Sequence, residues 1–147
     1  MKKILILISL LLMLVGCSQT ETVELDLNAL YQQLMTSGYF DEELEAMSDN
    51  LIVTEYNNIS YTEAKVATNA GANANQIALF KFEDVDQGYE TLKYYLENLE
   101  TNYASYQPEE VKKIENATFI KKGNYVLLVI GDDYQSIADL VNNFIEG

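Results

Sequence analysis

The sequence predicts an α+β fold in which an antiparallel sheet of about four strands packs against helices on one face. Some apolar residues recur at the three- and four-residue spacing of a helix, whereas others form short β-branched and aromatic runs typical of strands. These segments follow one another in the order α-β-β-α-α-β-β-α. Strands that come in pairs between helices are accommodated most simply by an antiparallel sheet.

A helix is expected to open the domain. Asp26 is suited to cap it, and Gly38 ends it. Between them, apolar side chains repeat at helical spacing at Leu27, Leu30, Tyr31, Leu34 and Met35. The acidic stretch 39–47 is expected to form a short helix, and a turn is expected near Asn57 and Asn58.

Two strands and the clearest helix of the chain follow. Residues 61–68 and 76–82 are predicted strands, joined by the loop 69–75, which is rich in Gly, Asn and Ala. Asp84 can cap the next helix, with Gln87 three residues later in a capping-box arrangement. The apolar stripe of this helix is Val85, Tyr89, Leu92, Leu96, Leu99 and Tyr103.

The last third is predicted to contain a helix, a hairpin and a final helix. Pro108 suits a first helical turn, and the acids after it and the lysines further on match the helix dipole. Residues 116–133 are expected to form a hairpin that turns near Gly123. Asp132 or Asp133 then caps a helix whose inward side chains are Ile137, Leu140, Val141 and Phe144.

Burial can be predicted for the centre of this fold. Residues 125–130 are apolar on both faces, as expected of a central strand. We therefore expect Leu127 and Val129 to be largely buried, together with Leu96 and Leu99 of the long helix.

The N-terminus has the pattern of a secretory signal. Lys2 and Lys3 give it a positive start, an apolar run follows to Val15, and Gly16 is a small residue at the expected cleavage point. The apolar run is shorter than the roughly 20 residues that a membrane-spanning helix needs. A transmembrane anchor is therefore not expected.

The cysteine after this run identifies the kind of signal. Leu14-Val15-Gly16-Cys17 resembles the lipobox of bacterial lipoproteins, and Cys17 is the only cysteine in the chain. The resemblance implies that residues 1–16 are removed and that Cys17 becomes an acylated N-terminus. Residues 17–25 would then be a lipidated tether and residues 26–147 a single domain, held by two or more acyl chains on the outer face of the cell membrane.

Charge and composition exclude several classes of function. The chain has 23 acidic residues against nine basic residues, all of them lysine, and removal of residues 1–16 would bring its formal charge to −16. Such a surface repels phosphate backbones, so nucleic acid is not an expected partner. With no histidine and with Cys17 acylated, the common general base and nucleophile are both missing. We expect no catalytic residue, metal ligand or cofactor.

The pattern of the whole chain resembles a known family. A lipobox leader is followed by "QIALFKFED" before a long helix, and then by "YQPEEVKKIENATFIKKGNYVLLVIGDD". In these features the chain is similar to the small lipoproteins grouped as domain of unknown function 4358, found mostly in low-GC Gram-positive bacteria, over about Asp26 to the C-terminus. The resemblance implies a secreted, membrane-anchored α+β domain, and it brings no activity and no site residue.

The acidic clusters and the tyrosines are the remaining candidate sites. Residues 41–45, 83–88 and 131–133 could offer oxygen ligands to Ca²⁺, but capping and solvation at helix starts explain them without a metal. Of the 11 tyrosines, Tyr94 should point away from the core, Tyr95 should lie on the flank of its helix, and Tyr106 should lie in the following loop. An exposed tyrosine is either a recognition handle or an ordinary surface residue.

These observations favour a non-catalytic binding or accessory module of the cell envelope. Its membrane partner would be the bilayer, through acylated Cys17, and its ligand an envelope protein, a peptide or a wall component. The alternative is an extracellular hydrolase, or a cation-dependent accessory enzyme, that uses carboxylates alone. A pocket that joins two carboxylates from different elements would favour this alternative.

Overall fold

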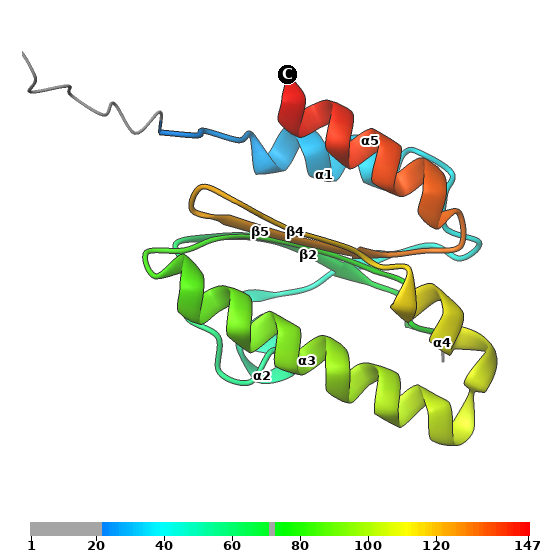
Figure 1. The fold of residues 1–147 in the computed structure, drawn as a ribbon. Coiled ribbons are helices and arrows are strands. Elements are labelled where there is room, and N and C mark those ends of the chain that lie inside the picture. Colours follow the sequence, from blue (N-terminus) through cyan, green and yellow to red (C-terminus); the bar gives the residue numbers. More distant parts are fainter. Residues whose placement is uncertain (1–21, 71–72) are drawn as a thin grey trace, which may run out of the picture.

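A five-stranded antiparallel sheet forms the middle layer of the molecule, with helices above and below it (Figure 1). The computed structural model describes residues 22–70 and 73–147, so Cys17 and the leader lie outside the described residues. The predicted α+β class and the antiparallel sheet are both confirmed.

The sheet has the strand order β1-β2-β3-β5-β4. Every neighbouring pair is antiparallel, and β3 and β5 occupy its centre. The strands are β1 (Glu45–Ala46), β2 (Glu63–Thr68), β3 (Gln76–Lys81), β4 (Thr118–Lys122) and β5 (Tyr125–Ile130). The four long strands are those expected from the sequence, and β1 is an additional two-residue strand at one edge.

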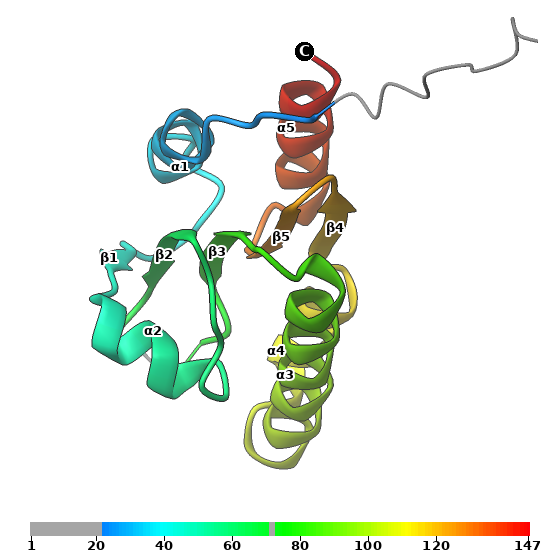
Figure 2. The ribbon, with the colours of Figure 1, turned by 90° about the vertical axis from the view of Figure 1, so that its left-hand side faces the viewer.

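Helices cover both faces of this sheet, so the expectation of a single covered face is wrong (Figures 1 and 2). The first and last helices lie on one face, and the other three lie on the opposite face. The helices are α1 (Leu27–Met35), α2 (Asp49–Glu55), α3 (Val85–Tyr106), α4 (Pro108–Glu115) and α5 (Tyr134–Glu146).

Apolar side chains on both faces of the central strands explain this arrangement. Side chains alternate between the two faces of a strand. On β5, Leu127 and Val129 enter the core beneath α1 and α5, whereas Leu128 enters the core beside α2, α3 and α4. A single helical layer would leave half of these side chains in water, at about 25 cal/mol for each Å² exposed.

The stretch 39–47 does not form the short helix expected for it. It is irregular up to Leu44, which is buried, and it ends in β1. Because α1 and α2 lie on opposite faces, the chain between them must pass around the β2 edge of the sheet (Figure 2). An extended segment spans that path, and pairing with β2 satisfies its backbone groups.

The long helix α3 begins as predicted but is rotated from the predicted phase. The Asp84 carboxylate accepts a hydrogen bond from the Gln87 N–H at 3.0 Å, which confirms the cap. Leu92 is fully buried, whereas Leu96 and Leu99 are only half-buried. The helix packs against α2 as well as the sheet, and this contact turns Tyr95 inward. Leu127 and Val129 are buried as expected.

The segment before α1 is fixed to one end of the sheet. The Glu24 carboxylate accepts hydrogen bonds from the Lys81 ammonium and the Tyr125 hydroxyl, both at 3.0 Å. Lys81 ends β3 and Tyr125 begins β5, so these contacts lie beside the β4–β5 turn. The described N-terminal segment therefore joins the domain at this end.

Replacement of Leu92 by alanine is expected to destabilise the domain by about 2–5 kcal/mol, because it empties a fully buried site. The matched change Leu96→Ala should cost less, since that side chain is half-buried. Urea unfolding of the two variants measures the difference. A larger loss for Leu96→Ala would contradict the observed rotation of α3.

Candidate functional site

The exposed tyrosines do not form one surface. Tyr94 and Tyr106 are 59% and 62% exposed, and Tyr106 is the last residue of α3 instead of a loop residue. Twelve residues separate them, or about 18 Å along the helix. At about 100° per residue they also point in directions about 120° apart. The structure therefore leaves each as a single exposed aromatic side chain.

Tyr95 is not on an exposed flank. It is 8% exposed, and its ring packs against that of Tyr56 with the centroids 4.5 Å apart. Its hydroxyl lies 3.2 Å from Gln76 Oε1, to which it donates a hydrogen bond. A role for Tyr95 as an exposed recognition handle is thus ruled out, although its hydroxyl contributes to the groove described below.

The acidic clusters have structural partners. Asp84 and Asp133 cap α3 and α5, and Asp86 pairs with Lys121 at 2.8 Å. Within residues 22–70 and 73–147, no group of three or more acidic, histidine or cysteine side chains is arranged to hold a metal ion. Helix starts attract carboxylates, because backbone N–H groups and the helix dipole stabilise negative charge there.

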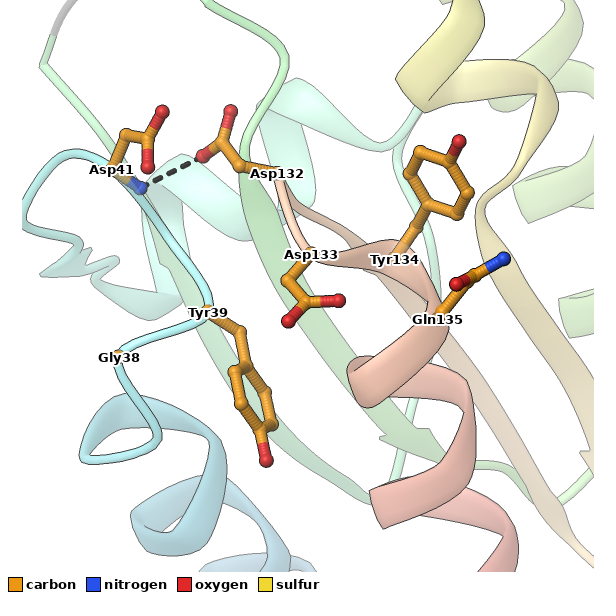
Figure 3. A pocket seen from close by; sticks show the side chains of 7 residues that line it. All are labelled: Gly38, Tyr39, Asp41, Asp132, Asp133, Tyr134 and Gln135. Atoms are coloured by element: carbon orange, nitrogen blue, oxygen red, sulfur yellow. Dashed lines mark hydrogen bonds between the residues drawn. The ribbon is translucent and has the colours of Figure 1, made fainter.

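One open depression, of about 500 Å³, does bring carboxylates together from different elements (Figure 3). It lies between the segment after α1 and the start of α5 and is lined by Gly38, Tyr39, Asp41, Asp132, Asp133, Tyr134 and Gln135. The Asp41 N–H donates a hydrogen bond to Asp132 Oδ2 at 2.8 Å.

The Asp132 carboxylate is already saturated by other groups of the chain. Its Oδ1 accepts a hydrogen bond from the Lys113 ammonium at 2.9 Å, and its Oδ2 accepts one from Asn75 Nδ2 at 2.6 Å. Lys113 also contacts Glu110 Oε2 at 2.7 Å. This network joins α4 to the ends of β3 and β5. It is a structural clasp, and we refer to Glu110, Lys113, Asn75 and Asp132 as the Lys113 clasp.

The electrostatics of the clasp oppose acid catalysis. Burial by itself raises the pKa of Asp132, but hydrogen bonds from Asp41, Lys113 and Asn75 outweigh it, so the pKa lies below its usual value. Burial lowers the pKa of Lys113, and its two carboxylate partners outweigh that effect and raise the pKa. A carboxyl with a lowered pKa stays ionised near neutral pH and has no proton to donate.

A second hollow is lined mainly by uncharged amide side chains. Two adjoining cavities of about 240 and 340 Å³ share Glu55, Tyr95 and Leu99 and so form one groove. Asn57, Asn98 and Asn102 line its outer part, and Asn69, Asn73, Asn75 and Gln76 line its inner part. Among the described residues, Glu55 is the only charged side chain lining either cavity. We call this hollow the amide groove.

Gln76 lies at the floor of the amide groove and is 3% exposed. Its Oε1 accepts hydrogen bonds from the hydroxyls of Tyr56 at 2.7 Å and Tyr95 at 3.2 Å. Burial raises the pKa of both phenols, so they remain protonated donors at physiological pH. Because Oε1 is held in place by two donors, Nε2 has a fixed orientation.

The Nε2 group of Gln76 makes no hydrogen bond to the part of the chain that the structure describes. This nitrogen is not enclosed, because the buried polar side-chain atoms without a partner among the described residues are Gln107 Oε1 and Thr118 Oγ1. Gln76 Nε2 therefore opens onto the groove, where water or a ligand can accept its hydrogen bond. The amide groove therefore offers a preorganised donor at its floor and further amide donors and acceptors on its outer wall, at Asn57, Asn98 and Asn102. The Asn75 amide is engaged in the Lys113 clasp.

A family model matches residues 56–131 of the chain and is described as "Domain of unknown function (DUF4358)". The chain belongs to this family. No curated protein and no solved structure matches the chain significantly. The resemblance predicted from the sequence is thus confirmed, over a shorter stretch than the expected Asp26 to the C-terminus.

The DUF4358 match contains the whole of β2–β5, α3 and α4. It includes all the amide side chains of the groove, whereas Glu55 lies just before it. The depression of Figure 3, by contrast, depends largely on Gly38 to Asp41 and on the start of α5, which lie outside the matched stretch. Most of the groove lies within the matched stretch, as does a smaller hollow of about 210 Å³ beside Tyr61 and Asp84.

Sequence reasoning missed the amide groove. Its amides lie just after α2, on α3, at the start of β3 and at Asn69, Asn73 and Asn75, and no local motif joins them. The one available signal was the concentration of Asn in "NAGANAN", which also suits a connecting loop.

Among the described helices, none is long and apolar enough to cross a membrane.

Replacement of Lys113 by methionine is expected to destabilise the DUF4358 domain by about 1–3 kcal/mol at pH 7, because two carboxylates lose their cation. The folded-state pKa of Asp132 is below the unfolded value, so its contribution is present above about pH 4 and is lost as the pH falls through the folded pKa. The cost of Lys113→Met should therefore shrink at low pH.

Chemical denaturation of the variant and of the natural chain between pH 7 and about pH 3 measures this change. Lys112→Met is the matched control, since Lys112 is an exposed neighbour on the same helix. Equal destabilisation by the two variants would show that the clasp contributes nothing.

Proposed function

We propose that this chain is a lipid-anchored, extracytoplasmic binding module of the cell envelope, and that the amide groove is its ligand site. The observation that carries the proposal is the groove itself. It is hydrogen-bonding and almost uncharged, in a chain of formal charge −14, and the amide donor at its floor has no acceptor among the described residues.

The anchor is supported by the N-terminal sequence. A positive start, a short apolar run and a small residue before Cys17 are the features that lipoprotein processing requires, and the thiol is the nucleophile that is acylated. Residues 18–24 are polar or small, and as a tether they would reach at most about 25 Å from Cys17 to Glu24, which is bound to the sheet. The acidic domain would be repelled by anionic headgroups and would stand off the bilayer.

The direction of β3 relates the anchor to the groove. Glu24 binds Lys81 at one end of this strand, and Gln76 lies at the floor of the groove at the other end. Five steps of about 3.4 Å separate the two ends, or about 17 Å. A module held by its N-terminus at the Lys81 end therefore carries the groove on the end away from its tether.

A binding function accounts for the sites better than the hydrolase alternative. A glycosidase needs a carboxyl group with a raised pKa beside a second carboxylate. The amide groove has one carboxylate, Glu55. The depression has a pair in Asp41 and Asp132, but Asp132 has a lowered pKa and its oxygens are engaged in hydrogen bonds. The depression therefore meets the geometric criterion for the alternative, but it lacks the carboxyl group with a raised pKa that the reaction needs.

The N-terminus of the mature protein tests the proposed anchor. The mature protein isolated from membranes should begin at Cys17 and carry the mass of two or more acyl chains, because one chain holds only weakly. Cys17→Ala should leave an unprocessed or released protein. Intact-mass analysis of both forms gives the answer, and a mature chain that begins at another residue would refute the anchor.

Crosslinking from the groove tests whether it is the ligand site. A photo-crosslinking residue in place of Asn98, which lines the groove, should capture an envelope component on intact cells. The same residue in place of Asn142 is the matched control, because Asn142 is also an exposed helical asparagine but lies on α5. Equal labelling from both positions, or none from position 98, would refute the groove as the ligand site.

A further inference from the structure

We propose that the ligand of the amide groove is a neutral saccharide chain, with uncharged hydroxyl and amide groups as the parts recognised. This inference rests on the proposed function and specifies its ligand. It follows from the charge of the groove, from the hydrogen-bonding groups that line it and from the small amount of apolar surface within it.

Charge selects against ionic ligands. The 23 acidic residues of the chain repel polyanions, including phosphate-bearing polymers. A cationic ligand would find only Glu55 in the groove, and the Glu55 carboxylate already lies 3.4 Å from the Tyr95 hydroxyl. An uncharged ligand avoids the repulsion and needs no ionic partner.

The lining offers both kinds of hydrogen-bonding group. Each asparagine or glutamine amide has a carbonyl acceptor and two N–H donors, and a sugar hydroxyl can likewise donate and accept. At the floor, Gln76 Nε2 is a donor whose partner must be an acceptor oxygen. A sugar hydroxyl or the carbonyl of an acetamido group supplies that oxygen and accepts the hydrogen bond.

Tyr95 and Tyr103 contribute the buried rings of the groove, and both have raised pKa values because of burial. They are 8% and 7% exposed, so they present an edge and not a broad stacking face. Leu99 and Met47 are half-buried and add a small apolar contact. This balance suits the C–H groups of a sugar ring better than large apolar side chains.

An extended peptide fits the groove less well. Peptides commonly bind by adding a strand to a free sheet edge or by filling apolar pockets. Gln76 and Thr68 at the floor belong to β3 and β2, and Gln76 is paired on both sides, with Thr68 and with Ile130. The backbone groups at this position are therefore already in the sheet, and the apolar surface is small.

Calorimetric titration of the full-length chain in phosphatidylcholine nanodiscs tests the proposal. The probes are the tetrasaccharides of N-acetylglucosamine and of glucose, with an uncharged tetra-alanine peptide as the competing class. At least one saccharide should bind saturably at concentrations up to about 10 mM, and more tightly than the peptide.

Variants of matched composition assign this binding to the groove. Asn98→Ala combined with Asn102→Ala removes two groove amides from exposed helical positions and should weaken saccharide binding at least about tenfold. Asn142→Ala combined with Asn143→Ala removes two exposed amides from α5 and should leave the affinity unchanged. Tyr95→Phe removes one hydroxyl from the floor and should also weaken binding.

The proposal is overturned if neither saccharide binds, if the peptide binds more tightly, or if the groove and α5 variants behave alike. Failure of the saccharide proposal can be separated from failure of the proposed function. A protein captured from position 98 without saccharide binding would keep the groove as a ligand site and remove the saccharide, whereas no capture would remove both.

Discussion

The two-sided apolar character of β3 and β5 is the constraint on which the rest of the structure depends. Ile77, Leu79, Leu127 and Val129 bury one face, and Ala78, Phe80, Val126 and Leu128 bury the other. Both faces must then be covered, so α1 and α5 lie on one side and α2 to α4 on the other (Figure 1). The places left for a polar site are the ends and edges of the sheet, and both hollows described here include sheet-end residues.

The Lys113 clasp and the amide groove have different roles, because their polar atoms are hydrogen-bonded to different degrees. In the Lys113 clasp each carboxylate meets a cation or an N–H group, so the cluster fastens α4 to the sheet. In the amide groove the two phenols fix Gln76 through its oxygen and leave its nitrogen without a protein acceptor. A donor that is held in a fixed direction and has no protein acceptor is available to a ligand oxygen, which is the physical reason for regarding the groove as a binding site.

The sequence was sufficient for the features that depend on local chemistry. The long strands, the Asp84 cap and the turn at Gly123 follow from periodicity, capping and backbone preference, and all are present. The sequence was insufficient for a helix such as α3, whose buried face depends on contacts with both the sheet and a second helix. The apolar stripe of α3 predicted Leu96 inward, but the contact with α2 buries Tyr95 and leaves Leu96 half-buried. The groove requires side chains from three separate segments, whose proximity depends on the fold as a whole.

The central claim is that the free amide of Gln76 and its neighbours recognise a neutral saccharide. Nuclear magnetic resonance of the side-chain NH₂ groups, during titration with the N-acetylglucosamine and glucose tetrasaccharides, observes these atoms directly. The account predicts that the Gln76, Asn98 and Asn102 side-chain signals shift together and saturate with at least one of the two sugars, whereas those of Asn142 and Asn143 stay in place. Unchanged Gln76, Asn98 and Asn102 signals with both sugars, or shifts confined to α5, would contradict it.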